Sequence, residues 1–203
     1  MISRASEYLL HPEKLFDVEF HELPDHHEER WWVLHTHPRA EKALARKFLQ
    51  LGLSFFLPLY ERVSRSSKRP TKAKHPLFPG YIFLRGDQEA RLSALKTNQI
   101  VSVLPVVDQN RLHSDLRQVY HLVCGREAVH PVANLEAGQP VRIIAGGFAG
   151  FEGMLVDTKN GLRFCVEVQF LKQGVSIEVE RWMLHPLGDG KQATQQRHET
   201  HYT

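Results

Sequence analysis

Cysteine is scarce in this chain of 203 residues, which contains only Cys124 and Cys165. The two stand far apart and form no C-x-x-C pair, so the sequence indicates neither a disulfide framework nor a cysteine-based zinc site. No run of about 18 apolar residues is present to form a membrane-spanning helix, and the first residues lack the pattern of a secretory signal. We therefore expect a cytoplasmic protein without membrane contact, with both cysteines buried as small apolar residues.

Motifs of catalysis and cofactor binding are also missing. The sequence has no nucleophile elbow and no HExxH motif. The glycine-rich stretch 146–153 lacks the Gly-Lys-Ser/Thr of a phosphate loop and runs into the strand-like Met154-Leu155-Val156, so a hairpin turn is the better interpretation. The densest histidine group, His26-His27 with His35 and His37, lacks the fixed ligand spacing of a zinc site. We expect no enzymatic activity, no cofactor and no metal.

Charge is unevenly distributed along the chain. Residues 39–75 contain ten Lys and Arg against two Glu, whereas residues 1–30 contain three basic and eight acidic residues. Such asymmetry predicts a surface that faces a polyanion, with an acidic extension beside it. Residues 1–29 show no sustained hydrophobic period, which predicts a flexible acidic extension. One hypothesis is that this extension shields the basic face until a partner is bound.

Residues 30–125 alternate between strand-like and helix-like patterns. A stripe of apolar residues from Ala40 to Leu51 indicates a helix that Gly52 ends, and Ser114 is a good N-cap for a later helix that ends at Gly125. The basic stretch 62–74 reads as an exposed hairpin or loop. The expected strands are 31–36, 55–60, 81–84 and 101–107, and the expected helices are 38–51, 88–96 and 114–123. This alternation predicts an α+β domain with helices packed on a mixed sheet.

The pattern changes after residue 125. Residues 126–137 contain Gly, Pro, Asn and charged residues without a period, which is typical of a linker. Residues 138–187 contain closely spaced short strands separated by Gly-containing turns such as Lys159-Asn160-Gly161, which predicts a small closed all-β barrel. The polar residues 188–203 are expected to be disordered.

Three segments resemble one known family. Arg30–Thr36 is similar to the opening strand of the NusG N-terminal domain, and Leu77–Leu84, with the sequence Leu-Phe-Pro-Gly-Tyr-Ile-Phe-Leu, is similar to the most recognisable segment of that domain. Gly138-x-x-Val141-x-Ile143 followed by 147–153 resembles the KOW motif. The resemblance covers about residues 30–187 and implies a NusG N-terminal domain, a linker and a KOW barrel. Leu77-Phe78-Pro79 resembles the RfaH branch, which implies a specialised antitermination paralogue.

The resemblance implies a binding partner for the first domain. NusG proteins dock an exposed aromatic patch on the clamp helices of the largest RNA polymerase subunit. Phe78 and Tyr81 match the patch, with Trp32, His35 and Tyr120 as further contacts, and we expect Phe78 to be exposed. We expect the chain to bind polymerase as a monomer.

The resemblance also implies contacts for the basic helix and for the KOW domain. Relatives bring the positions of Arg39, Lys42, Arg46 and Lys47 toward the upstream DNA fork and the non-template strand, although a solvated helix face would look the same. In the KOW domain, 170–174 replaces the Phe-Gly-Arg sequence that recruits Rho. Phe170 and Leu171 therefore fit an apolar contact to a small-subunit ribosomal protein better than recruitment of Rho.

A second function stays open at this point. KOW motifs also occur in ribosomal proteins, so the chain could be an RNA-binding module associated with the ribosome. The basic stretch from Arg62 to Lys74 would then contact RNA.

Overall fold

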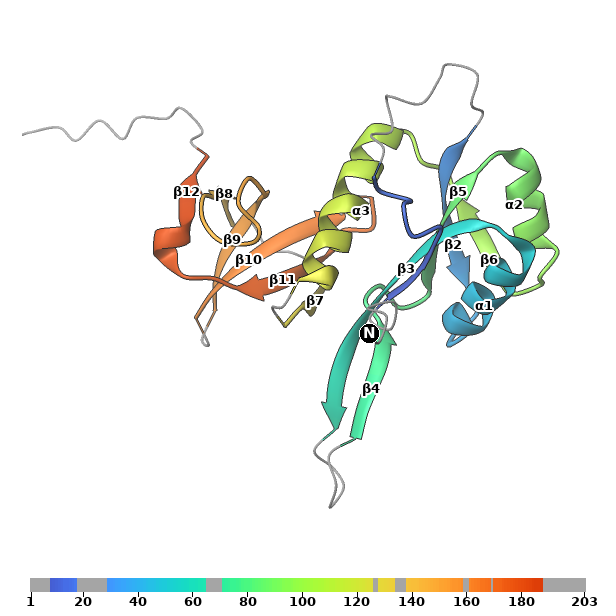
Figure 1. Cartoon of the computed structure of the whole chain (residues 1–203), viewed down its shortest axis with the longest axis horizontal. Helices are drawn as coiled ribbons and strands as arrows, with labels where there is room; N and C mark the ends of the chain where they lie inside the picture. Colours follow the sequence, from blue (N-terminus) through green and yellow to red (C-terminus); the bar gives the residue numbers. More distant parts are fainter. Residues whose placement is uncertain are drawn as a thin grey trace, which may run out of the picture.

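The computed structural model describes residues 8–17, 29–64, 71–125, 128–133, 138–158, 161–168 and 170–187 (Figure 1). Over these residues the chain forms two six-stranded sheets, with helices packed on the first. No helix in the described part is long and apolar enough to cross a membrane. The predicted tail 188–203, the linker residues 134–137 and the turn residues Lys159 and Asn160 lie outside the described residues.

The first sheet has the strand order β1-β3-β5-β2-β6, and β4 pairs with β3. Its strands are β1 (Tyr8–His11), β2 (Arg30–Thr36), β3 (Ser54–Ser64), β4 (Thr71–Pro76), β5 (Tyr81–Gly86) and β6 (Ile100–Leu104). Three helices accompany it: α1 (Glu41–Leu51), α2 (Gln88–Leu95) and α3 (Gln109–Cys124). The α+β class predicted from the sequence is confirmed.

Every ladder of this sheet is antiparallel, so the prediction of a mixed sheet is wrong in this detail. The crossovers explain the difference. α1 connects β2 to β3, and α2 connects β5 to β6, which makes the two strands of each pair parallel. In each pair another strand lies between them, β5 in the first and β2 in the second, so no parallel neighbours meet.

The helix ends follow local capping chemistry. Gly52 adopts a left-handed conformation, with φ of 67°, and ends α1 as predicted. Leu51, expected on the buried stripe, is 53% exposed because the stripe already ends at Phe48. α3 starts earlier than predicted: the side chain of Asp108 accepts a hydrogen bond from the Arg111 amide at 2.8 Å, and Ser114 lies inside the helix. Ser114 as the N-cap is therefore wrong.

The two faces of the first sheet have separate cores, because successive strand residues point to opposite sides. We call the side covered by α1 and α2 the α1/α2 face and the side covered by α3 the α3 face. The α1/α2 face buries Leu34, Leu44, Ala45, Phe48, Phe55, Leu57, Leu59, Ile82, Leu84 and Ala94. The first-sheet residues buried on the α3 face are Trp31, Val33, Phe56, Leu77, Phe78 and Phe83.

Residues 8–17 do not form the flexible extension that was predicted. Tyr8–His11 pair with Phe55–Pro58 of β3 as the edge strand β1. Leu15 and Phe16 are each only 3% exposed and belong to the core of the α3 face. The prediction failed because a four-residue strand and two apolar anchors give too short a pattern to show a period.

The second sheet is all-β, as predicted, with the order β12-β8-β9-β10-β11-β7 and antiparallel ladders throughout. Its strands are β7 (His130–Ala133), β8 (Gln139–Ile143), β9 (Glu152–Thr158), β10 (Gly161–Val168), β11 (Gln173–Glu178) and β12 (Leu184–Pro186). β7 lies within the range predicted as linker, so that prediction is wrong for residues 130–133.

α3 lies between the two sheets (Figure 1). It contacts β2 and β3 of the first sheet and β10 of the second. The buried apolar residues of the second sheet therefore form one continuous cluster with those of the α3 face. The second sheet contributes Val141, Ile143, Phe164, Val166, Val168, Val175 and Ile177 to this cluster.

Candidate functional site

The turn between β4 and β5 contains the Phe-Pro-Gly-Tyr segment singled out in the sequence. Phe78 is only 1% exposed, so the expectation of an exposed ring is wrong. The Tyr81 amide donates to the Phe78 carbonyl at 3.1 Å, which closes a tight turn and folds the Phe78 side chain inward. Its ring then packs edge-on against Phe83, with centroids 5.8 Å apart.

This turn is fixed from two sides. The Gly80 amide donates to Oε1 of Glu41 at 2.7 Å, and the Gly80 carbonyl accepts from the Thr36 amide at 2.8 Å. Gly80 has a φ of +84°, and an added Cβ would lie 3.4 Å from the His35 ring, so glycine suits both the conformation and the space. Sequence reasoning missed Glu41, which is 5% exposed and holds the turn against the start of α1.

The remaining aromatic residues proposed from the sequence divide between the two faces. His35 and Tyr81 are half-buried partners in the β2–β5 register, with ring centroids 5.3 Å apart. Tyr81 and Tyr120 are half-buried and pack at the margin of the α3-face core. Trp32 packs instead against the α1/α2-face core. The structure therefore gathers four of the five residues on one face and separates Trp32 from them.

Trp32 has a structural environment of its own. Its Nε1 donates to the Gly86 carbonyl at 3.0 Å. The guanidinium groups of Arg30 and Arg91 lie 5.4 and 5.2 Å from the ring centroid, close enough for cation–π attraction. These contacts account for Trp32 as a residue that joins β2 to the end of β5 and to α2.

The basic residues just before and within α1 are of two kinds. Arg39 and Arg46 are exposed. Lys42 donates through Nζ to the Lys74 carbonyl in β4, and Lys47 donates to the Thr97 carbonyl at 3.3 Å. The contact of Lys42 joins the basic helix to the basic β3–β4 hairpin, which extends away from the sheet (Figure 1). The two basic segments found in the sequence are therefore contiguous in space.

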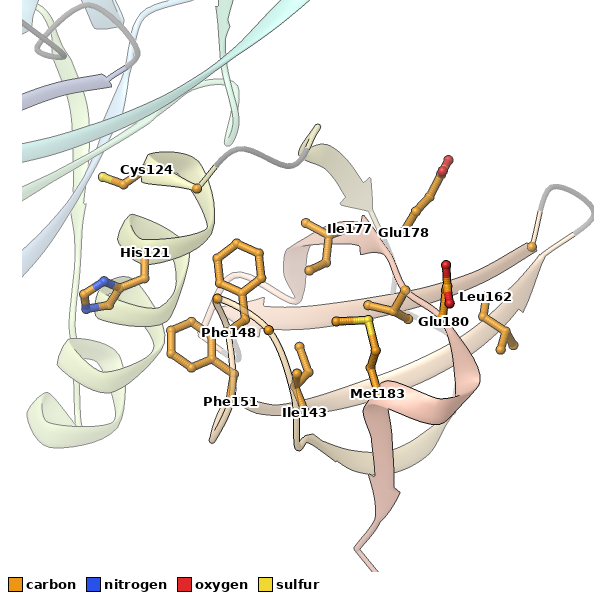
Figure 2. A pocket seen from close by; sticks show the side chains of 15 residues that line it. His121, Cys124, Ile143, Phe148, Phe151, Leu162, Ile177, Glu178, Glu180 and Met183 are labelled. Atoms are coloured by element: carbon orange, nitrogen blue, oxygen red, sulfur yellow. The ribbon is translucent and has the colours of Figure 1, made fainter.

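A cleft of about 1070 Å³ lies between the end of α3 and the second sheet (Figure 2). Its walls are mostly apolar, and Phe148 and Phe151 of the glycine-rich β8–β9 turn lie between that turn and α3. The Phe151 and His121 rings are 5.8 Å apart, and a Cβ on Gly125 would lie 2.4 Å from the Phe148 ring. The glycine-rich stretch is thus a hairpin turn, in line with the sequence interpretation.

The predicted partner residues of the second domain lie at the turn between β10 and β11. Phe170 is 37% exposed and borders a smaller cavity with Val107, Arg111 and Asp115, at the start of α3. Leu171 is half-buried against the continuous core, and its amide donates to the Val168 carbonyl at 2.9 Å. Phe170 therefore faces α3 in this conformation, and Leu171 supports the turn.

The two cysteines differ in burial: Cys124 is half-buried beside the cleft, so the expectation that both are buried is wrong for Cys124, whereas Cys165 carries no reactive chemistry in this arrangement. Cys165 is 2% exposed, and burial raises the pKa of its thiol to about 11. A thiol with a raised pKa is a poor nucleophile at neutral pH. In the described part of the chain, no three His, Cys, Asp or Glu side chains are grouped to hold a metal ion.

Comparison with known proteins identifies the family. The family model described as "Transcription termination factor nusG" matches residues 29–138, which is more than half of the chain. The chain belongs to the NusG family. It is 26% identical to the transcription termination/antitermination protein NusG of Xylella fastidiosa over 168 residues, covering 68% of this chain and 89% of that protein.

Further NusG relatives are more distant. The chain is 24% identical to NusG of Helicobacter pylori, over 72% of this chain and 88% of that protein. A solved structure described as "Domain interaction in Thermotoga maritima NusG" is 17% identical and covers 79% of this chain and 98% of that chain, with a TM-score of 0.47. This likeness is too weak to carry an argument about the fold.

Proposed function

We propose that this chain is a transcription elongation and antitermination factor that binds the clamp helices of the largest RNA polymerase subunit through the α3 face. The observation that carries the proposal is the gathering of His35, Tyr81 and Tyr120 on that face of a NusG-family chain. Aromatic residues at the margin of an apolar core are suited to bury against a helix pair. Phe78 is buried and fixes the turn that carries Tyr81, because its carbonyl accepts from the Tyr81 amide. Trp32 lies on the other face and has no part in the proposed contact.

Substitution of Tyr81 tests the interface. Tyr81→Ala should weaken binding to purified core RNA polymerase about tenfold or more, since a central aromatic anchor is worth over 1 kcal/mol. Trp32→Ala is the matched control, because Trp32 is also half-buried but packs against the α1/α2-face core. Equal affinities of the two variants, with both folded, would refute the proposed contact.

We also propose that Arg39 and Arg46, with Lys42 and Lys47 behind them, contact the non-template DNA strand. Arg39 and Arg46 are exposed, and the hydrogen bond from Lys42 to Lys74 extends the basic surface onto the hairpin. Binding to single-stranded DNA should weaken with salt, with a logarithmic slope of about −0.7 for each phosphate contacted. An unchanged slope in Arg39→Ala with Arg46→Ala would exclude these two residues.

The second domain is proposed to recruit a partner through Phe170 and Leu171. The turn lacks the Phe-Gly-Arg sequence of Rho-recruiting relatives, so a small-subunit ribosomal protein fits better than Rho, and a specialised antitermination role fits better than a general one. Because Phe170 borders the cavity beside Arg111, recruitment requires that this turn separate from α3. Phe170→Ala should abolish capture of the ribosomal protein without weakening capture of polymerase.

The ribosome-associated RNA-binding module is the second candidate, favoured by the basic β3–β4 hairpin. Capture of partners from a lysate of the source cells separates the two functions. Core polymerase subunits should be enriched on the intact chain. Enrichment of ribosomal RNA without polymerase would favour the alternative, and Lys72→Ala with Lys74→Ala should then reduce it.

A further inference from the structure

Residues 8–17 form a small structural unit at one edge of the first sheet. β1 adds to β3 through four paired positions, and β3 keeps its pairings with β4 and β5 on its other edge. A turn follows, in which the Leu15 amide donates to the Pro12 carbonyl at 3.0 Å. The unit thus consists of one edge strand, one turn and the two buried side chains of Leu15 and Phe16. Its removal would leave all other ladders of the sheet in place.

The ring of Phe16 is enclosed by aromatic side chains of the α3 face. It stacks on Trp31 and Tyr120, with centroids 5.7 and 5.1 Å away and interplanar angles of 17° and 29°. The ring of Phe56 meets it edge-on at 5.1 Å, and His113 lies at 5.7 Å. We call these four residues the aromatic box. Without Phe16 the box would present its aromatic walls to solvent.

A buried arginine of β5 also binds the segment 8–17, through its backbone. Arg85 in β5 is 7% exposed, and its Nη1 donates to the Leu15 carbonyl at 2.9 Å. Its Nε lies 3.6 Å from Oε2 of Glu29, at the start of the sheet. Burial lowers the pKa of Arg85, so the guanidinium is held at a desolvation cost. Release of the segment would return this charge to water, which offsets part of the loss of contacts.

Tyr120 connects the aromatic box with the proposed polymerase interface. The same ring that stacks on Phe16 is one of the aromatic residues proposed to contact the clamp helices. The ring face that stacks on Phe16 is closed to other contacts in the free protein. A helix pair that docks on this ring face must therefore displace the segment.

We propose that residues 8–17 are a displaceable cover of the polymerase-binding face, and that the clamp helices dock where Phe16 lies in the free protein. The inference rests on the proposed function and adds to it a competition inside the chain. The hypothesis that the acidic extension shields the basic face stays a separate prediction, because most acidic residues of 1–29 lie outside the described residues.

Weakening the cover provides the first test. Full-length Phe16→Ala should bind purified core RNA polymerase about fivefold more tightly than the wild type, because the open form becomes more populated. Glu13→Ala, an exposed position in the same segment, should bind as the wild type does. Weaker binding by Phe16→Ala would mean that Phe16 supports the interface, and would overturn the inference.

Locking the cover provides the second test, which does not depend on a cavity in the core. Tyr8 and Pro58 are paired in the β1–β3 register, at a spacing that a disulfide can bridge. Full-length Tyr8→Cys with Pro58→Cys should lose binding to core polymerase about tenfold or more when oxidised and regain it when reduced. Tyr8→Cys alone, treated in the same way, controls for oxidation of Cys124.

The results of the disulfide test distinguish failure of the proposed cover from failure of the proposed polymerase interface. Equal affinity of the oxidised and reduced double variant would overturn the cover and leave the polymerase interface standing. Absence of binding in every form, including the reduced protein, would overturn both. In the wild type, bound polymerase should speed hydrogen exchange at those β1 amides that bond to β3, and undiminished protection there would also contradict displacement.

Discussion

The two faces of the first sheet are closed in different ways. On the α1/α2 face, the covering helices are the connections between neighbouring segments of the chain. On the α3 face, the cover comes from distant parts: Phe16 near the start, α3 in the middle and the second sheet near the end. A face closed by its own crossovers is a stable core, whereas one closed by separate segments can be opened piece by piece.

Removal of an aromatic ring from the α1/α2 face should have the largest effect on the free energy of unfolding. Phe48 is fully buried, and its ring meets Phe55 at 5.7 Å. Phe48→Ala should lower the free energy of unfolding by about 3–5 kcal/mol, through lost burial and the cavity left behind. Denaturant unfolding would measure this. Leu51→Ala, on the same helix but 53% exposed, is the control and should change it by less than about 0.5 kcal/mol.

Loss of the contact that holds the turn between β4 and β5 should have the second-largest effect on the free energy of unfolding. Glu41→Ala removes the acceptor of the Gly80 amide and should cost about 2–3 kcal/mol, because that donor then lacks a partner in a half-buried position. Glu89→Ala, an exposed acidic residue in the first turn of α2, should cost much less. Equal losses in thermal unfolding would show that Glu41 acts only through the helix dipole.

On the α3 face, deletion of an equally large ring should lower the free energy of unfolding by less. Phe16→Ala should lower the free energy of unfolding by about 1–2 kcal/mol, since the loss cannot exceed the docking energy of its own segment. Hydrogen exchange should show lost protection in β1 while α1 stays protected. A loss as large as that of Phe48→Ala would show that both faces unfold as one unit.

This contrast also separates what the sequence predicts from what it does not. Periodicity located α1, α2 and most strands, because each was a local pattern in the sequence. The motif segments gave the family and the candidate residues. The burial of Phe78 and the docking of Phe16 escaped prediction, since both depend on contacts with residues remote in sequence. β7 escaped because a four-residue strand with a proline carries little signal.

The smallest expected effect concerns the start of α3, where the sequence predicts Ser114 as the N-cap and the structure has Asp108. Asp108 accepts from the Arg111 amide, whereas Ser114 is exposed inside the helix. Asp108→Ala should therefore cost about 1 kcal/mol, the usual value of an N-cap. Ser114→Ala should cost nothing, since alanine is the better helix former at an exposed interior position. The opposite ranking in denaturant unfolding would place the start of α3 at Ser114, and residues 109–113 would then contribute little to the cover of the α3 face.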